Sequence, residues 1–178
     1  MSDKIRIHDL DPHFKDEIAR EPGCQHLKRC FSCGVCTATC PVSEIEPSFS
    51  PSEIIRQILY GMRGPLLASP ALWHCARCAN CSFRCPQDVR FLDVIQGLRN
   101  LAIREGIITA GRAVLLEQAE HLVQELRRRL ISEILAGPEG MELKAALAKV
   151  ISEVSGEESA NESIESAIRS KTETRKQS

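Results

Sequence analysis

The sequence predicts an all-α protein that contains two cysteine-rich loops, each followed by a helix, with further helices toward the C-terminus. Three observations support this prediction. The pattern C-x2-C-x2-C-x3-C-P occurs twice, as CFSCGVCTATCP at 30–41 and as CARCANCSFRCP at 75–86. Apolar residues recur at helical spacing after each run, which indicates amphipathic helices. No segment shows the alternation of apolar and polar residues that half-buried strands require.

The helix after the first run has signals at both ends. A hydroxyl at Ser50 or Ser52 can cap its N-terminus, and Pro51 suits its first turn. Gly61 and the Gly64–Pro65 pair are expected to end it. Its apolar stripe consists of Ile54, Ile55, Ile58, Leu59 and Met62.

Four further helical segments are predicted along the chain. Gly106 is the expected C-cap of the helix that follows the second run, Gly111 separates that helix from the next, and Gly137–Pro138 stops the next one. The stretch LLASPALWH at 66–74 is expected to form a turn or a brief helix. The four segments are Pro12–Ala19, Phe91–Glu105, Arg112–Ala136 and Met141–Val154.

These patterns divide the chain into four regions. Residues 1–23 form an N-terminal extension, and residues 24–111 form a domain that contains both cysteine loops. Residues 112–154 form a C-terminal helical extension. Residues 155–178 are rich in Ser, Glu, Lys and Thr, and we expect this polar tail to be flexible.

Composition excludes several classes of protein. The formal net charge is −1, whereas proteins that bind nucleic acid usually carry a basic patch. The first residues contain no apolar core of a signal peptide, and no run of about eighteen apolar residues indicates a transmembrane segment. We therefore expect a cytoplasmic protein. In that reducing compartment, clustered cysteines favour metal binding over disulfides.

Eight of the nine cysteines lie in the two runs, with the spacing of [4Fe–4S] ligands. The first three cysteines of a run can reach three iron corners of one cubane, while the proline turns the fourth cysteine away. In two-cluster proteins with this run, the fourth cysteine binds the other cluster. The sequence therefore predicts two [4Fe–4S] clusters with crossed ligands. One is held by Cys30, Cys33, Cys36 and Cys85, and the other by Cys75, Cys78, Cys81 and Cys40.

Other uses of these cysteines fit the spacing less well. Tetrahedral zinc needs two C-x2-C pairs separated by a longer loop, and a thioredoxin-type motif needs a βαβ context. The ninth cysteine, Cys24, is a candidate extra thiol ligand, although a buried or free thiol is the more common role. No phosphate-binding loop, nucleophile–base pair or dinucleotide motif accompanies the runs. The chain alone therefore has no predicted catalytic residue.

The two runs, each followed by a helix, resemble the α-helical ferredoxin domain. Within that superfamily, CGVC…CPVSE…SPSEIIRQI and WHCARCANCSFRCPQDV are similar to the C subunits of heterodisulfide reductases, over roughly residues 24–108. The resemblance implies an iron–sulfur subunit that relays single electrons between two partners. One is the flavin-containing A subunit, which also carries iron–sulfur clusters, and the other is the disulfide-reducing, catalytic B subunit. The resemblance also implies that the chain acts as part of an oxidoreductase complex and is not catalytic alone.

Two alternatives remain open at this point. The pattern also fits the iron–sulfur subunit of another respiratory or bifurcating dehydrogenase, although such subunits usually add a [2Fe–2S] or a Cys-Cys-Gly domain. The sequence contains no Cys-Cys pair. The pattern also fits a scaffold or sensor module that the clusters stabilise, and reversible reduction of the clusters separates that module from a relay.

Overall fold

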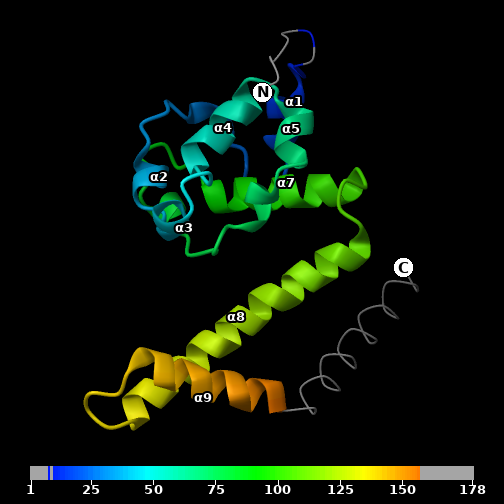
Figure 1. Ribbon diagram of the computed structural model, residues 1–178. Coiled ribbons are helices and arrows are strands. Elements are labelled where there is room, and N and C mark those ends of the chain that lie inside the picture. Colours follow the sequence, from blue (N-terminus) through cyan, green and yellow to red (C-terminus); the bar gives the residue numbers. More distant parts are fainter. Residues whose placement is uncertain (1–7, 9, 157–178) are drawn as a thin grey trace, which may run out of the picture. The chain divides into compact units, whose positions relative to one another are not determined.

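The computed structural model describes residues 8 and 10–156, and every regular element within this part of the chain is a helix (Figure 1). The all-α prediction is therefore confirmed. The predicted flexible tail at 155–178 lies outside the described residues from position 157 onward. The helices are α1 (Phe14–Ile18), η2 (Leu27–Arg29), α2 (Val35–Ala38), α3 (Pro41–Ile45), α4 (Pro51–Leu59), α5 (Arg63–Leu67), η3 (Pro70–Trp73), α6 (Asn80–Phe83), α7 (Phe91–Arg104), α8 (Ala110–Ala136) and α9 (Leu143–Gly156).

The chain divides into two compact units, Met1–Leu116 and Glu117–Ser178. The first, which we call the cysteine unit, contains both cysteine runs and the helices from α1 to α7. Its core is built mainly from α4 and α7, and α1 packs against both of these helices. Phe14 and Ile18 of α1 are fully buried, so this N-terminal helix belongs to the core. Burying each such side chain contributes about 1.5–3 kcal/mol.

The helix after the first run begins as predicted. Ser50 is its N-cap, and its hydroxyl accepts a hydrogen bond from the Glu53 N–H at 3.3 Å. The helix ends at Leu59, and Gly61 follows in the left-handed region with φ of 78°. The Gly64–Pro65 pair lies instead inside α5, because the first turn of a helix tolerates proline.

The later helices match their predicted positions closely. α7 ends at Arg104, and Gly106 follows with φ of 71°, as a helix-terminating glycine does. α8 begins at Ala110 rather than Arg112, so Gly111 lies inside this helix and does not separate it from a preceding one. In the second unit, Lys149 of α9 forms an ion pair with Glu133 of α8 at 2.6 Å. No helix in the described part of the chain is both long and apolar enough to cross a bilayer.

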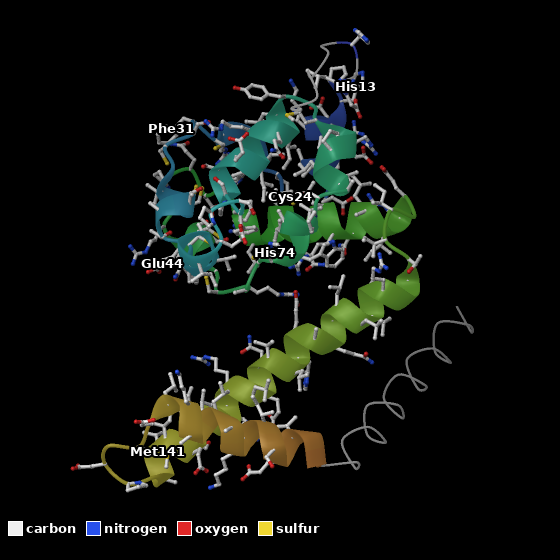
Figure 2. All side chains as sticks on the ribbon, viewed as in Figure 1. His13, Cys24, Phe31, Glu44, His74 and Met141 are labelled. Atoms are coloured by element: carbon white, nitrogen blue, oxygen red, sulfur yellow. The ribbon has the colours of Figure 1, made fainter. Side chains whose placement is uncertain are left out.

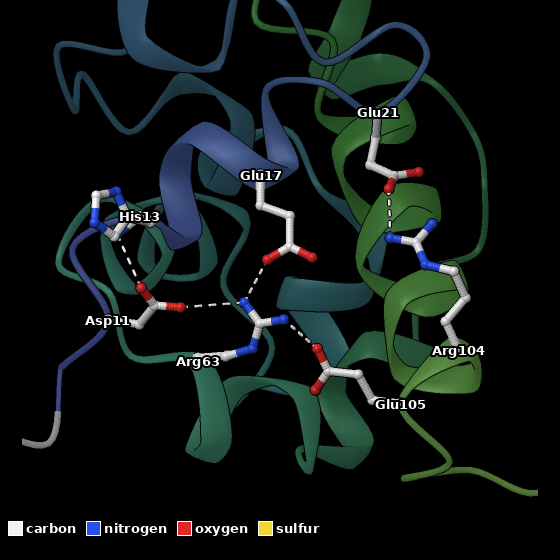
Figure 3. Close-up of polar contacts among 7 residues, drawn as sticks. All are labelled: Asp11, His13, Glu17, Glu21, Arg63, Arg104 and Glu105. Carbon is white, nitrogen blue, oxygen red and sulfur yellow. Dashed lines mark hydrogen bonds and ion pairs between the residues drawn. The ribbon is translucent and has the colours of Figure 1, made fainter.

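One arginine joins three parts of the cysteine unit (Figure 3). The Arg63 guanidinium at the start of α5 forms ion pairs with Asp11, Glu17 and Glu105. It also lies over the Phe14 ring, 5.4 Å from its centroid. The hydrogen bond to Glu17 is the main cause of a raised pKa for Arg63, since the carboxylate stabilises the charged guanidinium. These contacts fasten the N-terminal segment to α5 and to the end of α7.

Candidate metal centre

The first cysteine loop is shaped by two left-handed backbone positions. The chain leaves Cys30 and turns through Ser32, with φ of 58°, and Gly34, with φ of 78°, before α2 begins. A non-glycine residue in this region costs roughly 1–2 kcal/mol, so the fold holds Ser32 there against its local preference. The Ser32 N–H donates a hydrogen bond to the Cys30 Sγ at 3.4 Å. The loop therefore curls its backbone around the sulfur.

The second loop repeats this geometry. Arg77, with φ of 54°, and Ala79, with φ of 63°, take the places of Ser32 and Gly34, and α6 takes the place of α2. Burial raises the pKa of Cys75, and a hydrogen bond from the Arg77 N–H opposes that rise. The short helices α2 and α6 pack against each other. The repeat in the sequence is therefore a structural repeat, and its two copies meet.

The fourth cysteine of the first run leaves its loop through extended backbone. Cys40 is the N-cap of α3, with φ of −87° and ψ of 117°, and Pro41 occupies the first position of that helix. Proline disfavours helical geometry in the residue before it, which explains why the chain changes direction at this cysteine. The predicted consequence of the C-P pair is thus present at Cys40.

A cavity is lined by cysteines of both runs. Apolar side chains form much of the remaining wall, among them Val35, Ile55, Val89 and Phe91. The wall behind these sulfurs is therefore mainly apolar. The cysteines that line this cavity are Cys30, Cys33 and Cys36 of the first run with Cys81 and Cys85 of the second.

Cys40 lies within electrostatic range of the second run. Burial is the first cause of the raised pKa of Cys75, and the charges of Cys40 and Cys78 raise it further. Cys40 also borders a surface hollow together with Asn80, at the start of α6. Burial likewise raises the pKa of Cys81 to about 11, with a further contribution from Cys75. The fourth cysteine of each run therefore lies near the other run.

The chemistry of these thiols fits a group that carries positive charge. Iron binds thiolates, yet burial raises the pKa values of Cys36, Cys75 and Cys81 and so favours their neutral form. A bound cationic group reverses this preference because it stabilises the thiolates directly. No three His, Cys, Asp or Glu side chains within residues 8 and 10–156 are close enough to share a single metal ion.

One hydroxyl connects each loop to the helix that follows it. Thr37 Oγ1 accepts a hydrogen bond from the Ser52 N–H in the first turn of α4 at 3.0 Å. Burial raises the pKa of the Cys36 thiol, and hydrogen bonds from the Thr37 hydroxyl and N–H partly offset this. The Thr37 hydroxyl thus connects the first turn of α4 to Cys36, the third cysteine of the run, through hydrogen bonds.

The second loop contains the equivalent chain of hydrogen bonds. Ser82 Oγ accepts from the Leu92 N–H in the first turn of α7 at 3.3 Å, and Ser82 also hydrogen-bonds to Cys81. Neither hydroxyl residue was predicted from the sequence. The signal that would have found them is the repeat itself, because a hydroxyl residue follows the third cysteine in both runs.

The ninth cysteine lies apart from the cavity wall. Cys24 is fully buried in the core of the cysteine unit, whereas Phe31 within the first run is 59% exposed (Figure 2). The Cys24 Sγ donates to the Pro22 carbonyl at 3.7 Å. Burial, with contributions from Asp93 and Glu21, raises its pKa to about 12. These surroundings are those of a protonated core thiol.

Comparison with known proteins identifies the same features. Residues 29–90 match the family model described as a 4Fe-4S dicluster domain. The second form of the iron-sulfur C subunit of CoB–CoM heterodisulfide reductase from Methanocaldococcus jannaschii is 30% identical over 145 residues, which cover 71% of this chain and 75% of that protein.

Two further relatives carry similar names. The C subunit of the H(2):CoB-CoM heterodisulfide,ferredoxin reductase of Methanothermobacter thermautotrophicus is 36% identical over 62% of this chain and 59% of its own length. The C subunit of the ferredoxin:CoB-CoM heterodisulfide reductase of Methanosarcina acetivorans is 39% identical over 58% of this chain and 41% of its own length. The chain thus spans about half the length of these two relatives. It carries a domain for [4Fe–4S] clusters, and it belongs to the family of heterodisulfide reductase C subunits.

Proposed function

We propose that this chain is the electron-transferring iron–sulfur subunit of a heterodisulfide-reductase-like complex, with two [4Fe–4S] clusters. In this proposal it connects the flavin-containing A subunit with the catalytic B subunit, which reduces a disulfide. The names of the relatives support the class of complex, since they include both heterodisulfide and ferredoxin reductases. The family membership and the paired cysteine loops support the role of electron carrier.

The crossed ligand sets are supported by the placement of the fourth cysteines. Cys85 lines the same cavity as the three leading cysteines of the first run, and this single observation carries the proposal. Cys81 lines this cavity as well, and its place as the third cysteine of the second run assigns it to the second cluster. Cys40 is near enough to Cys75 to influence its pKa. The first cluster would therefore be held by Cys30, Cys33, Cys36 and Cys85, and the second by Cys75, Cys78, Cys81 and Cys40.

The protein's own residues would control how each cluster behaves. When bound, each cluster supplies a site that stores a single electron. The apolar wall formed by Ile55, Val89 and Phe91 limits water near the first set of sulfurs. The second cysteine of each run, Cys33 or Cys78, is exposed. A partner can therefore approach either loop at a sulfur ligand, as a relay with a donor on one side and an acceptor on the other requires.

Two matched variants test the crossed assignment. Cys85→Ser removes the fourth ligand of the cluster bound by the first run, and Cys40→Ser removes that of the other cluster. The β-protons of cysteines bound to a cluster give shifted NMR signals that identify the loop holding it. We expect Cys85→Ser to disturb the signals of Cys30 and Cys36, and Cys40→Ser to disturb those of Cys75. If Cys85→Ser disturbed only signals of the second run, and Cys40→Ser only signals of the first run, the crossed assignment would be refuted.

A second experiment tests the relay itself. Reconstitution of the chain with the A and B subunits should give disulfide reduction driven by the flavin. Cys85→Ser should leave the complex assembled but block this electron delivery. Clusters that bind to the chain but cannot be reversibly reduced would instead identify a scaffold or sensor.

A further inference from the structure

A buried arginine lies beside the second cysteine loop. Arg99 of α7 is only 3% exposed, and its Nε donates a hydrogen bond to the Leu72 carbonyl at 2.7 Å. Its Nη2 lies 3.5 Å from the carbonyl oxygen of Cys75. Its guanidinium also lies over the Trp73 ring, 5.2 Å from the centroid. These contacts fix the charge of Arg99 at the point where the chain enters the second loop.

The field of Arg99 reaches the first sulfur of this loop. The Arg99 guanidinium lies beside Cys75, with Nη2 3.5 Å from the carbonyl oxygen of that residue, so its positive charge stabilises negative charge on this part of the loop. An arginine keeps its charge at every physiological pH. In an interior of low dielectric, such a charge interacts more strongly with its neighbours than it would in water.

The structural repeat shows that this charge belongs to one loop only. The second loop contains counterparts of the hydrogen bonds to sulfur in the first loop. The Arg77 N–H takes the place of the Ser32 N–H, and Ser82 takes the place of Thr37. These contacts therefore act on both loops alike. The helices after the two runs are related by 40 positions, because Ser52 and Leu92 occupy the equivalent first-turn place in α4 and α7. In this register Arg99 corresponds to Leu59, an apolar residue that is partly buried against the core.

Apolar side chains such as Ile55 and Phe91 line a cavity that both loops share, since Cys30, Cys33 and Cys36 border it together with Cys81 and Cys85. The wall of this cavity therefore does not distinguish the loops. Arg77 also adds a positive charge to the second loop, but its side chain is exposed, where solvent and salt screen it. Arg99 is therefore the buried charge that distinguishes the loops.

Such a charge alters the reduction potential of a cluster nearby. A [4Fe–4S] cluster becomes more negative by one charge when it accepts an electron, and net charge, burial and hydrogen bonds to sulfur set its potential. A fixed cation stabilises the more negative, reduced form. An apolar wall without a cation favours the less charged, oxidised form.

We propose that Arg99 gives the cluster bound by Cys75, Cys78 and Cys81 the higher reduction potential of the two. In a molecule that has taken up one electron from a chemical reductant, the electron then resides at the second loop. The first-loop cluster stays oxidised, and no proton is taken up. This inference rests on the proposed two-cluster assembly.

The wild-type protein provides a direct test. The anaerobic protein is titrated with dithionite until each molecule holds on average one electron, and the shifted cysteine β-proton NMR signals are recorded. We expect the signals of a reduced cluster from Cys75, Cys78 and Cys81, with those of Cys30 and Cys33 in the oxidised pattern. Reduction at the first loop, or equally at both loops, would overturn the proposal.

Three variants separate the charge of Arg99 from its structural contacts. Arg99→Gln removes the charge, and we expect the potential of the second-loop cluster to fall while that of the first-loop cluster stays unchanged. Arg99→Lys keeps the charge and should retain most of the wild-type potential. Arg104→Gln loses the same charge from the same helix, but Arg104 is exposed in an ion pair with Glu21. This control should shift neither potential measurably.

These experiments separate a failure of the Arg99 inference from a failure of the two-cluster proposal on which it depends. Equal potentials for Arg99→Gln and Arg99→Lys would show that Arg99 is only structural and would overturn the inference. If Arg99→Gln does not assemble, the half-reduced wild type still tests the order of the two potentials, and a fall of the second-loop potential to the first-loop value in Arg99→Lys, which keeps the charge, would overturn the inference. Wild-type protein with about four irons per chain would instead remove the two-cluster proposal itself.

Discussion

At the scale of single residues, the hydroxyls of Thr37 and Ser82 are the contacts that best connect the fold to the expected redox chemistry. Each accepts a backbone N–H from the first turn of a helix and bonds to the third cysteine of its run. The positive end of a helix dipole lies at its N-terminus. Both hydroxyls therefore couple that positive end to a sulfur, which favours a reduced cluster.

Removal of either hydroxyl should lower one potential and leave the other unchanged. We expect Thr37→Val to lower the potential of the first-loop cluster, and Ser82→Ala that of the second-loop cluster. The potential should shift by on the order of tens of millivolts. This shift corresponds to a fraction of the 1.5–3 kcal/mol that a hydrogen bond to a charged group contributes. Redox titration followed by EPR measures both.

A threonine next to this position provides the control. The Thr39 hydroxyl donates to the Val35 carbonyl at 3.0 Å and therefore bonds to backbone. Thr39→Val should leave both potentials as in the wild type. Equal shifts in Thr37→Val and Thr39→Val would show that these hydroxyls act through loop structure and not through the sulfur.

The buried thiol of Cys24 predicts a dependence of stability on alkaline pH. Its pKa is about 12 in the folded protein, against about 8.5 in an unfolded chain. A raised pKa means that the folded state retains the proton. The stabilisation is therefore complete below pH about 8.5 and is lost as the pH rises toward about 12.

Cys24→Ala should remove this dependence and keep the wild-type iron content. Its thermal midpoint should fall less between pH 8 and pH 10 than that of the wild type, because the variant has no thiol to ionise at this position. If the thermal midpoint falls equally in Cys24→Ala and in the wild type, Cys24 does not contribute to the alkaline instability. Loss of iron from the variant would show that this thiol is a cluster ligand.

At the scale of the secondary-structure elements, the turn after α4 determines how the N-terminal segment joins the core. Gly61 has φ of 78°, and its carbonyl accepts the Asp11 N–H at 2.8 Å. A Cβ atom added at Gly61 would lie 2.2 Å from the Asp11 carbonyl oxygen. Only glycine permits both the left-handed conformation and this close approach.

Gly61→Ala should therefore cost about 2 kcal/mol or more of stability, because it combines backbone strain with a backbone clash. Gly106→Ala is the matched control. Its φ is 71°, but an added Cβ would meet no atom within 4 Å. The control should lose only the conformational cost of about 1 kcal/mol. Chemical denaturation measures both, and equal losses would show that the clash with Asp11 is relieved by a small movement.

The sequence was sufficient to predict the helices that have strong local signals. The cap at Ser50 and the terminating glycine at Gly106 are interactions between near neighbours, so they could be predicted without the tertiary structure. Gly111 was wrongly taken as a boundary, because a single glycine costs only about 1 kcal/mol inside a helix. The helix α5 was missed because Pro65 was interpreted as a stop and not as a first-turn residue.

At the scale of the whole molecule, the repeat explains both what could be predicted about the centre and what could not. The cysteine spacing was enough to propose ligand sets, because the metal chemistry fixes that spacing. Arg99 was missed because it occupies an apolar position of α7, between Ile95 and Ala102, where helical periodicity predicts only core packing. Its neighbour Cys75 lies 24 residues away in sequence. Such differences between the two halves depend on tertiary contacts.

The proposed function depends on two cubane clusters that the two loops hold together. Chemical analysis of iron and acid-labile sulfide in anaerobically purified protein counts these clusters. We expect about eight irons and about eight sulfides per chain. About four irons per chain or fewer, in protein that is folded and fully reconstituted, would contradict this proposal.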